Sequence, residues 1–354
     1  MNRSLKFEVE PFEFNEKLMQ TPGPFEVAAA SHPTLGPGRR VPRQREIEKF
    51  ETPLAAFHPS LGPGRRVPRT AEIDTELEII GIDERKQVNN TTEVPFRWIC
   101  SLDLMFPDPD DPAYYLEFVG SGVLISPRHV LTAGHCLYDR ISGSAGTSAT
   151  VEVARVRATP GRNGSLTAPF GSAMSTGVQY NANWRASRDF RFDYGLITLN
   201  GDIGAKRMSA LDGSILGYWG SRSYGSNTRI NPKERSFLQG KPVNISGYPA
   251  DKLVGTQWRA YGQVTNARPT AGLQLIYYDL DTCGGHSGSP VWLRWQQYRN
   301  LVAIHTGTCI PGRECSPVSG PACFPGRQRY SSNRGILITA DVLSEVKRWV
   351  GSTR

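Results

Sequence analysis

A serine surrounded by glycines is the feature that most constrains this chain. Ser287 lies in the stretch Asp281-Thr-Cys-Gly-Gly-His-Ser-Gly-Ser-Pro290, and an apolar run follows it. Because glycine lacks a Cβ, the backbone there can turn sharply and approach a bound carbonyl group. The amides of Gly285 and Ser287 can then point at one place and stabilise an oxyanion. We interpret this stretch as the loop of a nucleophile.

Two upstream stretches supply what such a nucleophile needs. In Val130-Leu-Thr-Ala-Gly-His-Cys136 an apolar strand ends in small residues and presents His135. In Phe192-Asp-Tyr-Gly-Leu-Ile-Thr-Leu199 an acidic residue, Asp193, precedes an alternating strand. A serine hydroxyl requires a base, and the base requires a group that orients it. We therefore predict a triad of His135, Asp193 and Ser287, in the chain order of chymotrypsin-like proteases. The alternative is three unrelated loop residues.

Composition favours an all-β chain with an irregular additional segment. Of 354 residues, 38% are hydrophobic, 36 are glycine and 26 are proline, which is typical of many turns. The net charge of +8 is compatible with acidic partners, but no aromatic-basic recognition motif accompanies it. No apolar run is long enough to span a bilayer. We expect neither a nucleic-acid nor a membrane partner.

Two features give opposite indications of the cellular compartment. Six cysteines, an even number, favour an oxidising environment and an extracellular protein. The residues that follow Met1 lack the continuous apolar core of a secretory signal. A start codon placed too far downstream, or a non-standard export route, would reconcile them.

Residues 1–78 differ from the rest and contain an internal duplication. The stretch His32-Pro-Thr-Leu-Gly-Pro-Gly-Arg-Arg-Val-Pro-Arg43 recurs as His58-Pro-Ser-Leu-Gly-Pro-Gly-Arg-Arg-Val-Pro-Arg69. Its prolines and glycines exclude helix and disfavour central strands, and two copies are too few for a solenoid. We predict a largely irregular pro-segment or tether.

Residues 79–354 show many short alternating strands separated by glycine and proline turns, which indicates a sandwich or barrel. A Gly/Ser-rich stretch, about 203–235, separates two lobes at about 79–205 and 235–354. His135 and Asp193 fall in the first lobe and Ser287 in the second, so the site is expected between them. Near the end, Val342, Val346, Trp349 and Val350 share a helical face, with Thr339 as N-cap.

The motifs around the three triad residues, TAGHC, FDYG and GGHSGSPV, resemble the glutamyl endopeptidases, a bacterial branch of the chymotrypsin-like serine proteases. The likeness covers about 79–350 and includes Asp83-Glu-Arg, Ile245-Ser-Gly-Tyr-Pro and Ser332-Asn-Arg-Gly. It implies two six-stranded β-barrels with a C-terminal helix, and hydrolysis of protein or peptide substrates after glutamate or aspartate. We expect such an enzyme to need no cofactor and no metal.

The resemblance also assigns a primary pocket to Thr282 and His305. A hydroxyl and an imidazole can both donate hydrogen bonds to a substrate carboxylate. Asp281 is one position away from Thr282, so it does not match the aspartate that a trypsin-like pocket uses for Lys or Arg. Taken alone, His305 could equally be a core histidine.

His286 departs from the digestive proteases, which place an aspartate there to pair with a newly freed N-terminus. That switch is therefore not expected, and in the glutamyl branch the freed amine assists substrate binding instead. Processing is predicted at Glu78–Ile79, where the likeness begins. Cleavage after Glu76 or after Arg69 is the alternative.

For the cysteines, the chymotrypsin-like pattern implies the pairs Cys100–Cys136, Cys283–Cys309 and Cys315–Cys323, although six cysteines allow fifteen connectivities. A nucleophilic Cys283 is the functional alternative, but Ser287 has the better context. A zinc site is disfavoured because short Cys/His spacings are missing.

The sequence thus predicts a monomeric serine endopeptidase. The alternatives are a serine protease of another specificity and a catalytically silent protease-fold binding protein.

Overall fold

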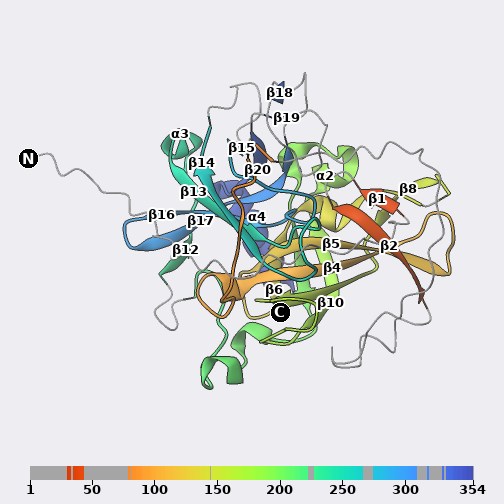
Figure 1. Ribbon diagram of the computed structural model, residues 1–354, viewed down its shortest axis with the longest axis horizontal. Helices are drawn as coiled ribbons and strands as arrows, with labels where there is room; N and C mark the ends of the chain where they lie inside the picture. The colour runs from red at the N-terminus through yellow and green to blue at the C-terminus, as the bar shows by residue number, and fades with distance from the viewer. Residues whose placement is uncertain are drawn as a thin grey trace, which may run out of the picture.

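Two β-barrels form the body of the protein (Figure 1). The structure is a computed structural model, and it describes residues 30–32, 35–43, 79–80, 82–143, 145–221, 227–265, 274–308, 317–318, 329–330 and 332–353. Most described residues that are not loops lie in strands, and the helices are few and mostly short. The all-β prediction is confirmed.

The first barrel has six antiparallel strands in the order β5-β4-β9-β10-β11-β6. They are β4 (Ile99–Pro107), β5 (Tyr114–Leu124), β6 (His129–Thr132), β9 (Arg155–Pro160), β10 (Ala173–Tyr180) and β11 (Gly195–Leu199). Pairing of Val123 with Leu131 joins β5 to β6 and closes the barrel. A separate hairpin, β7 (Tyr138–Ser142) and β8 (Ser148–Glu152), follows the strand that leads to His135.

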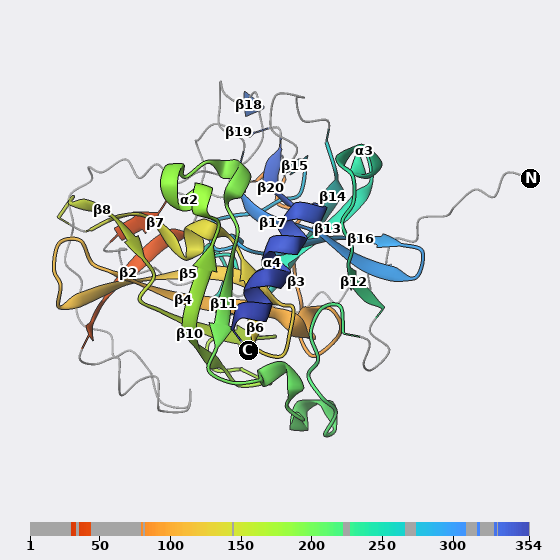
Figure 2. The same cartoon turned by 180° about the vertical axis from the view of Figure 1, so that it is seen from behind.

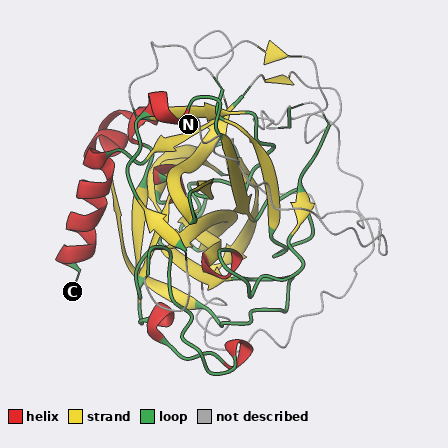
Figure 3. Cartoon of the chain, turned by 90° about the vertical axis from the view of Figure 1, so that its left-hand side faces the viewer, coloured by secondary structure: helices red, strands yellow, loops and turns green. Residues whose placement is uncertain are grey.

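The second barrel also has six strands, in the order β15-β20-β17-β16-β13-β14. They are β13 (Pro242–Gly247), β14 (Trp258–Gln263), β15 (Leu275–Tyr278), β16 (Pro290–Trp295), β17 (Tyr298–Thr308) and β20 (Asn333–Leu337). An isolated bridge between Val264 and Tyr278 connects the two ends of this order. In the view of Figure 3 the strands surround a common interior.

Shorter strands attach to these barrels or pair with each other. β3 (Lys86–Gln87) pairs with β14, β12 (Thr228–Ile230) runs parallel to β17, and β18 (Pro317–Val318) pairs with β19 (Arg329–Tyr330). The 3-10 turns are η1 (Phe96–Trp98), η2 (Gly134–Cys136), η3 (Phe190–Phe192), η4 (Ile203–Ala205) and η5 (Ser209–Leu211).

Three tryptophans join the barrels. The Trp219 ring lies 6.4 Å from that of Trp98 and 5.6 Å from that of Trp292, both edge-on. The indole N–H of Trp98 donates to the carbonyl of Leu216, which satisfies a buried polar group. Burial of one large apolar side chain stabilises the folded state by about 1.5–3 kcal/mol. This junction holds the two lobes in one arrangement.

The C-terminal helix, α4 (Ala340–Ser352), crosses back to the first barrel, and Figure 2 shows it beside β11 and β6. Thr339 caps it as predicted, and its side chain accepts from the amide of Val342. Trp349 packs 5.7 Å from the ring of Tyr194. Two shorter helices are α2 (Ala182–Ser187) and α3 (Arg235–Leu238).

Part of the N-terminal segment differs from the irregular chain that was expected. β1 (Ala30–His32) and β2 (Gly36–Pro42) form a hairpin, and β2 also pairs with β5. Residues 36–38 pair only with β1, and residues 39–42 pair only with β5. Each proline of β2 therefore has a paired strand on one side only. β2 can accommodate these prolines for this reason, because proline is tolerated at a strand edge.

The predicted Cys100–Cys136 disulfide is wrong. Both thiols are free and buried: that of Cys100 points at the carbonyl of Trp98, 3.7 Å away, and that of Cys136 at the carbonyl of Ser287, 3.8 Å away. Burial raises the pKa of the Cys100 thiol above its usual value. Cys283 is disulfide-bonded, and its partner lies outside the described residues, as do Cys309, Cys315 and Cys323.

Candidate active site

An imidazole and a carboxylate meet within the first barrel. His135 lies in η2, directly after β6, and Asp193 lies between η3 and β11. Nδ1 of His135 is 2.8 Å from one carboxylate oxygen of Asp193, and the backbone amide of His135 donates to the other oxygen at 2.8 Å. Because β6 and β11 are paired neighbours, the sheet register brings the two turns together. The carboxylate thus fixes both the ring and the backbone of His135.

Small and aromatic residues hold this turn in place. A Cβ on Gly134 would lie 2.9 Å from the Trp184 ring and 3.1 Å from the Asp193 carboxylate, so glycine is required there. Trp184 packs edge-on to the imidazole with ring centroids 6.4 Å apart, and its indole donates to the carbonyl of Tyr138. The ring of His135 therefore has little freedom to rotate.

The carboxylate also sets the charge of the imidazole. Complete burial lowers the pKa of His135, but the charge of Asp193 and the neighbouring Cys136 raise it by more. The result is a pKa of His135 well above its ordinary value. Such a base readily accepts a proton and retains it as an imidazolium next to the carboxylate.

The nucleophile loop turns as its glycines predict. Gly285 and Gly288 have φ of +96° and +84°, a backbone region that favours glycine. A Cβ on Gly285 would lie 2.5 Å from the carbonyl oxygen of Tyr248, and one on Gly288 would lie 2.1 Å from the Thr132 hydroxyl. Ser287 between them is 1% exposed. The loop is thus pressed against the end of β6, the strand that leads to His135.

Ser121 of β5 connects the first barrel to this loop, and it was not among the residues predicted from the sequence. Its hydroxyl donates to the carbonyl of Gly285 at 2.7 Å, and its amide donates to the carbonyl of Ser287 at 2.8 Å. The same hydroxyl accepts from the amide of Tyr248. Ser121 therefore fixes the two peptide planes that carry the carbonyls of Gly285 and Ser287. The small-residue run Val119-Gly-Ser-Gly122 inside a strand was the available signal.

His286, directly before the serine, is neutral. Its Nδ1 accepts from the amide of Cys283 at 3.1 Å, and the ring is fully buried. Burial, with a contribution from the charge of Arg85, holds the pKa of His286 well below its ordinary value. It therefore offers no negative charge to an N-terminus, in agreement with the sequence argument.

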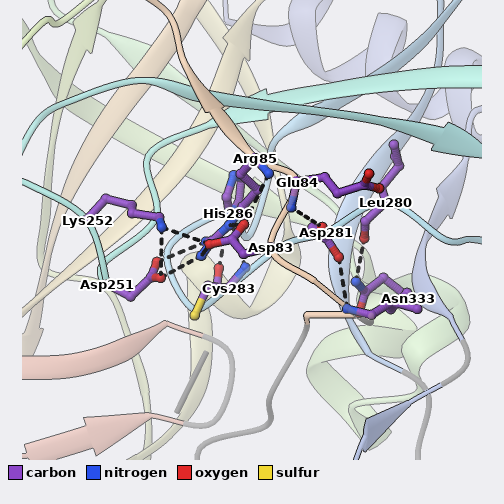
Figure 4. A network of polar contacts seen from close by, with 11 residues as sticks. Asp83, Glu84, Arg85, Asp251, Lys252, Leu280, Asp281, Cys283, His286 and Asn333 are labelled. Carbon is purple, nitrogen blue, oxygen red and sulfur yellow. Dashed lines mark hydrogen bonds and ion pairs between the residues drawn. The ribbon is translucent and has the colours of Figure 1, made fainter. Parts of the chain in front are cut away.

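Asp281 binds the backbone of the segment that begins at Ile79 (Figure 4). One carboxylate oxygen accepts from the amide of Ile80 and the other from the amide of Glu84, both at 2.8 Å. Burial raises the pKa of Asp281 to about 6, although both amides act to lower it. Ile79 is 2% exposed, whereas Glu78 lies outside the described residues.

A buried cation lies beside this contact. Arg85 donates to the carboxylates of Asp83 and Asp251, at 2.6 to 2.9 Å, and Lys252 contacts Asp83 at 2.8 Å (Figure 4). Burial acts to raise the pKa of Asp83, but Arg85 and Lys252 lower it well below its usual range. The cluster joins residues 83–85 to the loop that precedes β14.

The two predicted pocket residues are both fully buried, Thr282 in the nucleophile loop and His305 on β17. Nδ1 of His305 is 2.8 Å from the hydroxyl of Tyr278, and that hydroxyl donates to the carbonyl of Arg334. The single phenolic proton is thereby used, so Tyr278 accepts from Nδ1–H of His305. The carbonyl of His305 accepts from the amide of Gly288, which ties β17 to the nucleophile loop.

Within the described ranges, no group of three or more His, Cys, Asp or Glu side chains could hold a metal ion. In the same part of the chain, no helix is both long and apolar enough to cross a membrane.

Comparison with known proteins gives consistent matches. A family model described as a trypsin-like peptidase domain matches residues 120–304. A glutamyl endopeptidase of Bacillus licheniformis is 35% identical over 278 residues, covering 78% of this chain and 70% of that protein. An extracellular metalloprotease of Bacillus subtilis is 29% identical, with coverages of 77% and 69%.

A solved structure of a Glu endopeptidase in complex with MPD is also similar. It has a TM-score of 0.54 and 26% identity, covering 76% of this chain and 98% of that one. Together with the double-barrel fold, these matches show that the chain belongs to the trypsin-like peptidases, in their glutamyl endopeptidase branch, and is a serine endopeptidase.

Proposed function

We propose that the protein hydrolyses peptide bonds after glutamate, or aspartate, with His135, Asp193 and Ser287 as its catalytic triad. The observation that carries the proposal is the double contact of Asp193 with the ring and the amide of His135, each at 2.8 Å. It leaves Nε2 as the ring nitrogen that exchanges a proton with the nucleophile. The nucleophile loop lies against the strand that ends at this imidazole.

In the proposed reaction, Ser287 attacks the substrate carbonyl while His135 takes its proton. Asp193 keeps the imidazole in one tautomer and stabilises its charged form. The amides of Gly285 and Ser287 receive the oxyanion, and each such donor is worth about 3 kcal/mol. His135 then protonates the leaving amine, and water releases the acyl group by the same steps.

We assign acidic specificity to His305 and Thr282. Because Tyr278 accepts from Nδ1–H of His305, Nε2 can donate to a substrate carboxylate only when the ring is an imidazolium. Glutamate binding is therefore coupled to protonation of His305. The carboxylate of Asp281 is engaged by the amides of Ile80 and Glu84, which argues against a role as receptor for a basic side chain.

We further propose that residues 1–78 are a pro-segment and that 79–354 is the protease domain, separated by a cut at Glu78–Ile79. The contact between Asp281 and the amide of Ile80 supports this position, because it fixes the new terminus next to Thr282. N-terminal sequencing of active enzyme tests the assignment. An enzyme that still begins at Met1 would contradict it.

Secretion, a monomeric state and the disulfides Cys283–Cys309 and Cys315–Cys323 complete the proposal. The disulfide-bonded state of Cys283 and the extracellular name of the Bacillus subtilis relative support it. Partial reduction followed by peptide mapping tests the pairing.

Two measurements on one preparation test the main proposal. A fluorophosphonate probe should label Ser287 in the wild-type chain and fail to label Ser287→Ala, whose folding is checked by its melting temperature. A catalytically silent binding protein would not be labelled. A peptide library should then be cut after Glu and Asp, whereas cuts after other residues would support a protease of another specificity.

A further inference from the structure

β2, which is part of the first copy of the duplicated motif, pairs with β5 of the first barrel. β5 closes the barrel through its C-terminal half, while residues 114–117 in its N-terminal half extend beyond β6 and pair with β2. In Figure 1 the hairpin of β1 and β2 lies alongside β5. The amide of Arg43 continues the contact to the carbonyl of Ala113. Without β2 this edge of β5 would be unpaired, and an unpaired strand edge is a template for an added strand.

Acidic side chains at this edge bind two of the three arginines of the motif, Arg39 and Arg40. Arg39 lies opposite Glu117 and donates to its carboxylate at 3.0 Å. Arg40 donates to Asp108 at 2.8 Å and to Asp111 at 3.0 Å. The side chain of Asp108 is 0% exposed, so its charge needs a partner such as Arg40.

Aromatic side chains of β5 add to this recognition. The guanidinium of Arg40 lies 3.9 Å from the ring centroid of Tyr114, and that of Arg43 lies 4.7 Å from that of Tyr115. Aromatic rings stack more favourably with the guanidinium of Arg than with the ammonium of Lys.

The remaining motif residues fit by shape. Leu35 is 0% exposed and belongs to the core of the first barrel, and Val41 is 5% exposed. Gly38 lies flat on Phe118, since a Cβ there would come within 2.4 Å of the ring. The site therefore selects a glycine at one position and two arginines directly after it.

All of these groups occur a second time in the chain. Residues 61–69 repeat residues 35–43 without a single difference, including the leucine, the critical glycine and the three arginines. We propose that the edge of β5 is a docking site for this strand and that either copy, from the same chain, can fill it. The inference does not depend on the catalytic assignment.

Duplication then keeps the edge covered. Both copies are tethered to the same barrel, so each is present at a high effective concentration, and loss of one copy leaves the other available. A long uncovered edge would favour pairing with other chains.

Hydrogen exchange of the full-length chain tests the proposal, in a Ser287→Ala background that prevents self-cleavage. The variants are R39E/R40E, R65E/R66E and the four-fold combination, and the readout is exchange of residues 114–118. Each double variant should keep wild-type protection, and the four-fold variant should exchange at least about tenfold faster. Loss of protection in R39E/R40E alone would show that the copies are not interchangeable. Wild-type protection in the four-fold variant would show that the arginines do not hold the strand.

Charge reversal supplies an independent check. Glu117→Lys, combined with R39E and R65E, should restore protection relative to R39E and R65E alone, because the ion pair is rebuilt with opposite sign. Failure of this rescue would contradict the assigned register. Protection in R39E/R40E that depends on protein concentration would place the second copy on another chain and contradict binding within one chain.

Discussion

His135 and His286 are both fully buried, yet their surroundings give them opposite charge preferences. His135, in the first barrel, contacts the Asp193 carboxylate, and its pKa lies well above the ordinary value. His286, in the nucleophile loop of the second barrel, accepts a hydrogen bond from the backbone of Cys283 and lies near Arg85, and its pKa lies well below the ordinary value. Burial lowers the pKa of both rings, so the neighbouring charge decides the outcome.

The two regions also differ in how they are built. The histidine turn is held by side chains from the same lobe, Asp193 just before β11 and Trp184 of α2. The nucleophile loop is held mainly by backbone contacts, and two of them come from Ser121 of the other barrel. The proposed base is therefore positioned within one lobe, whereas the shape of the proposed oxyanion site depends on the docking of both lobes.

Removing the charge that distinguishes the two imidazoles should have the largest effect. Asp193→Asn should lower kcat by about 10⁴-fold, because the wrong tautomer and an unstabilised imidazolium are then present. A base works when neutral, so activity falls as pH drops through the raised pKa of His135. Without the carboxylate, this acid limb of kcat/KM should move to lower pH. Asp202→Asn, on the exposed surface of the same barrel, is the control. An unmoved limb would contradict the role of Asp193.

Cutting the contact between the barrels should have the next largest effect. Ser121→Ala removes the hydroxyl that holds the Gly285 carbonyl, so kcat should fall about tenfold to a hundredfold while KM changes little. Ser101→Ala is a matched control, since Ser101 is buried and pairs directly with Ser121 across β4 and β5. Equal losses in both variants would indicate a general effect on stability.

A third buried imidazole sharpens the comparison, because its proposed charge depends on substrate. His305→Gln should reduce kcat/KM for cleavage after Glu by about tenfold to a hundredfold and change cleavage after Gln much less. Parallel assays with peptides that differ only at this position measure the ratio. His129→Gln is the control, a buried histidine that contacts Ser126 and Thr353. An unchanged ratio would remove His305 from the pocket.

The smallest effect concerns stability and pH. The pKa of His286 is lowered in the folded state. Below about pH 6.5 the unfolded chain therefore binds a proton at His286, whereas the folded chain does not. The free energy of unfolding should therefore fall as pH drops from 6.5, by up to about 1.4 kcal/mol per pH unit from this group. His286→Gln in a Ser287→Ala background should lose that slope in urea titrations between pH 5 and 7. Parallel slopes would show that His286 is protonated in the fold.

Much of the site was accessible from the sequence because its local signals are strong. Glycines at positions that need a positive φ marked the candidate nucleophile loop, alternating strands indicated a sandwich or barrel, and the family resemblance implied two barrels. Contacts between distant strands left no comparable signal. The thiols of Cys100 and Cys136 point at different carbonyls instead of at each other, and β2 fits a sheet although its composition disfavours strand.

The sequence by itself determined the all-β class, the candidate residues His135, Asp193 and Ser287 in their chain order, and the capped C-terminal helix, because these follow from residue type and spacing within short windows. Only the tertiary structure decided the opposite charge preferences of His135 and His286, the clamp made by Ser121, and the docking of the first motif copy on β5. The reason is physical: a pKa, a peptide-plane orientation and an edge pairing depend on neighbours that the fold supplies from far along the chain.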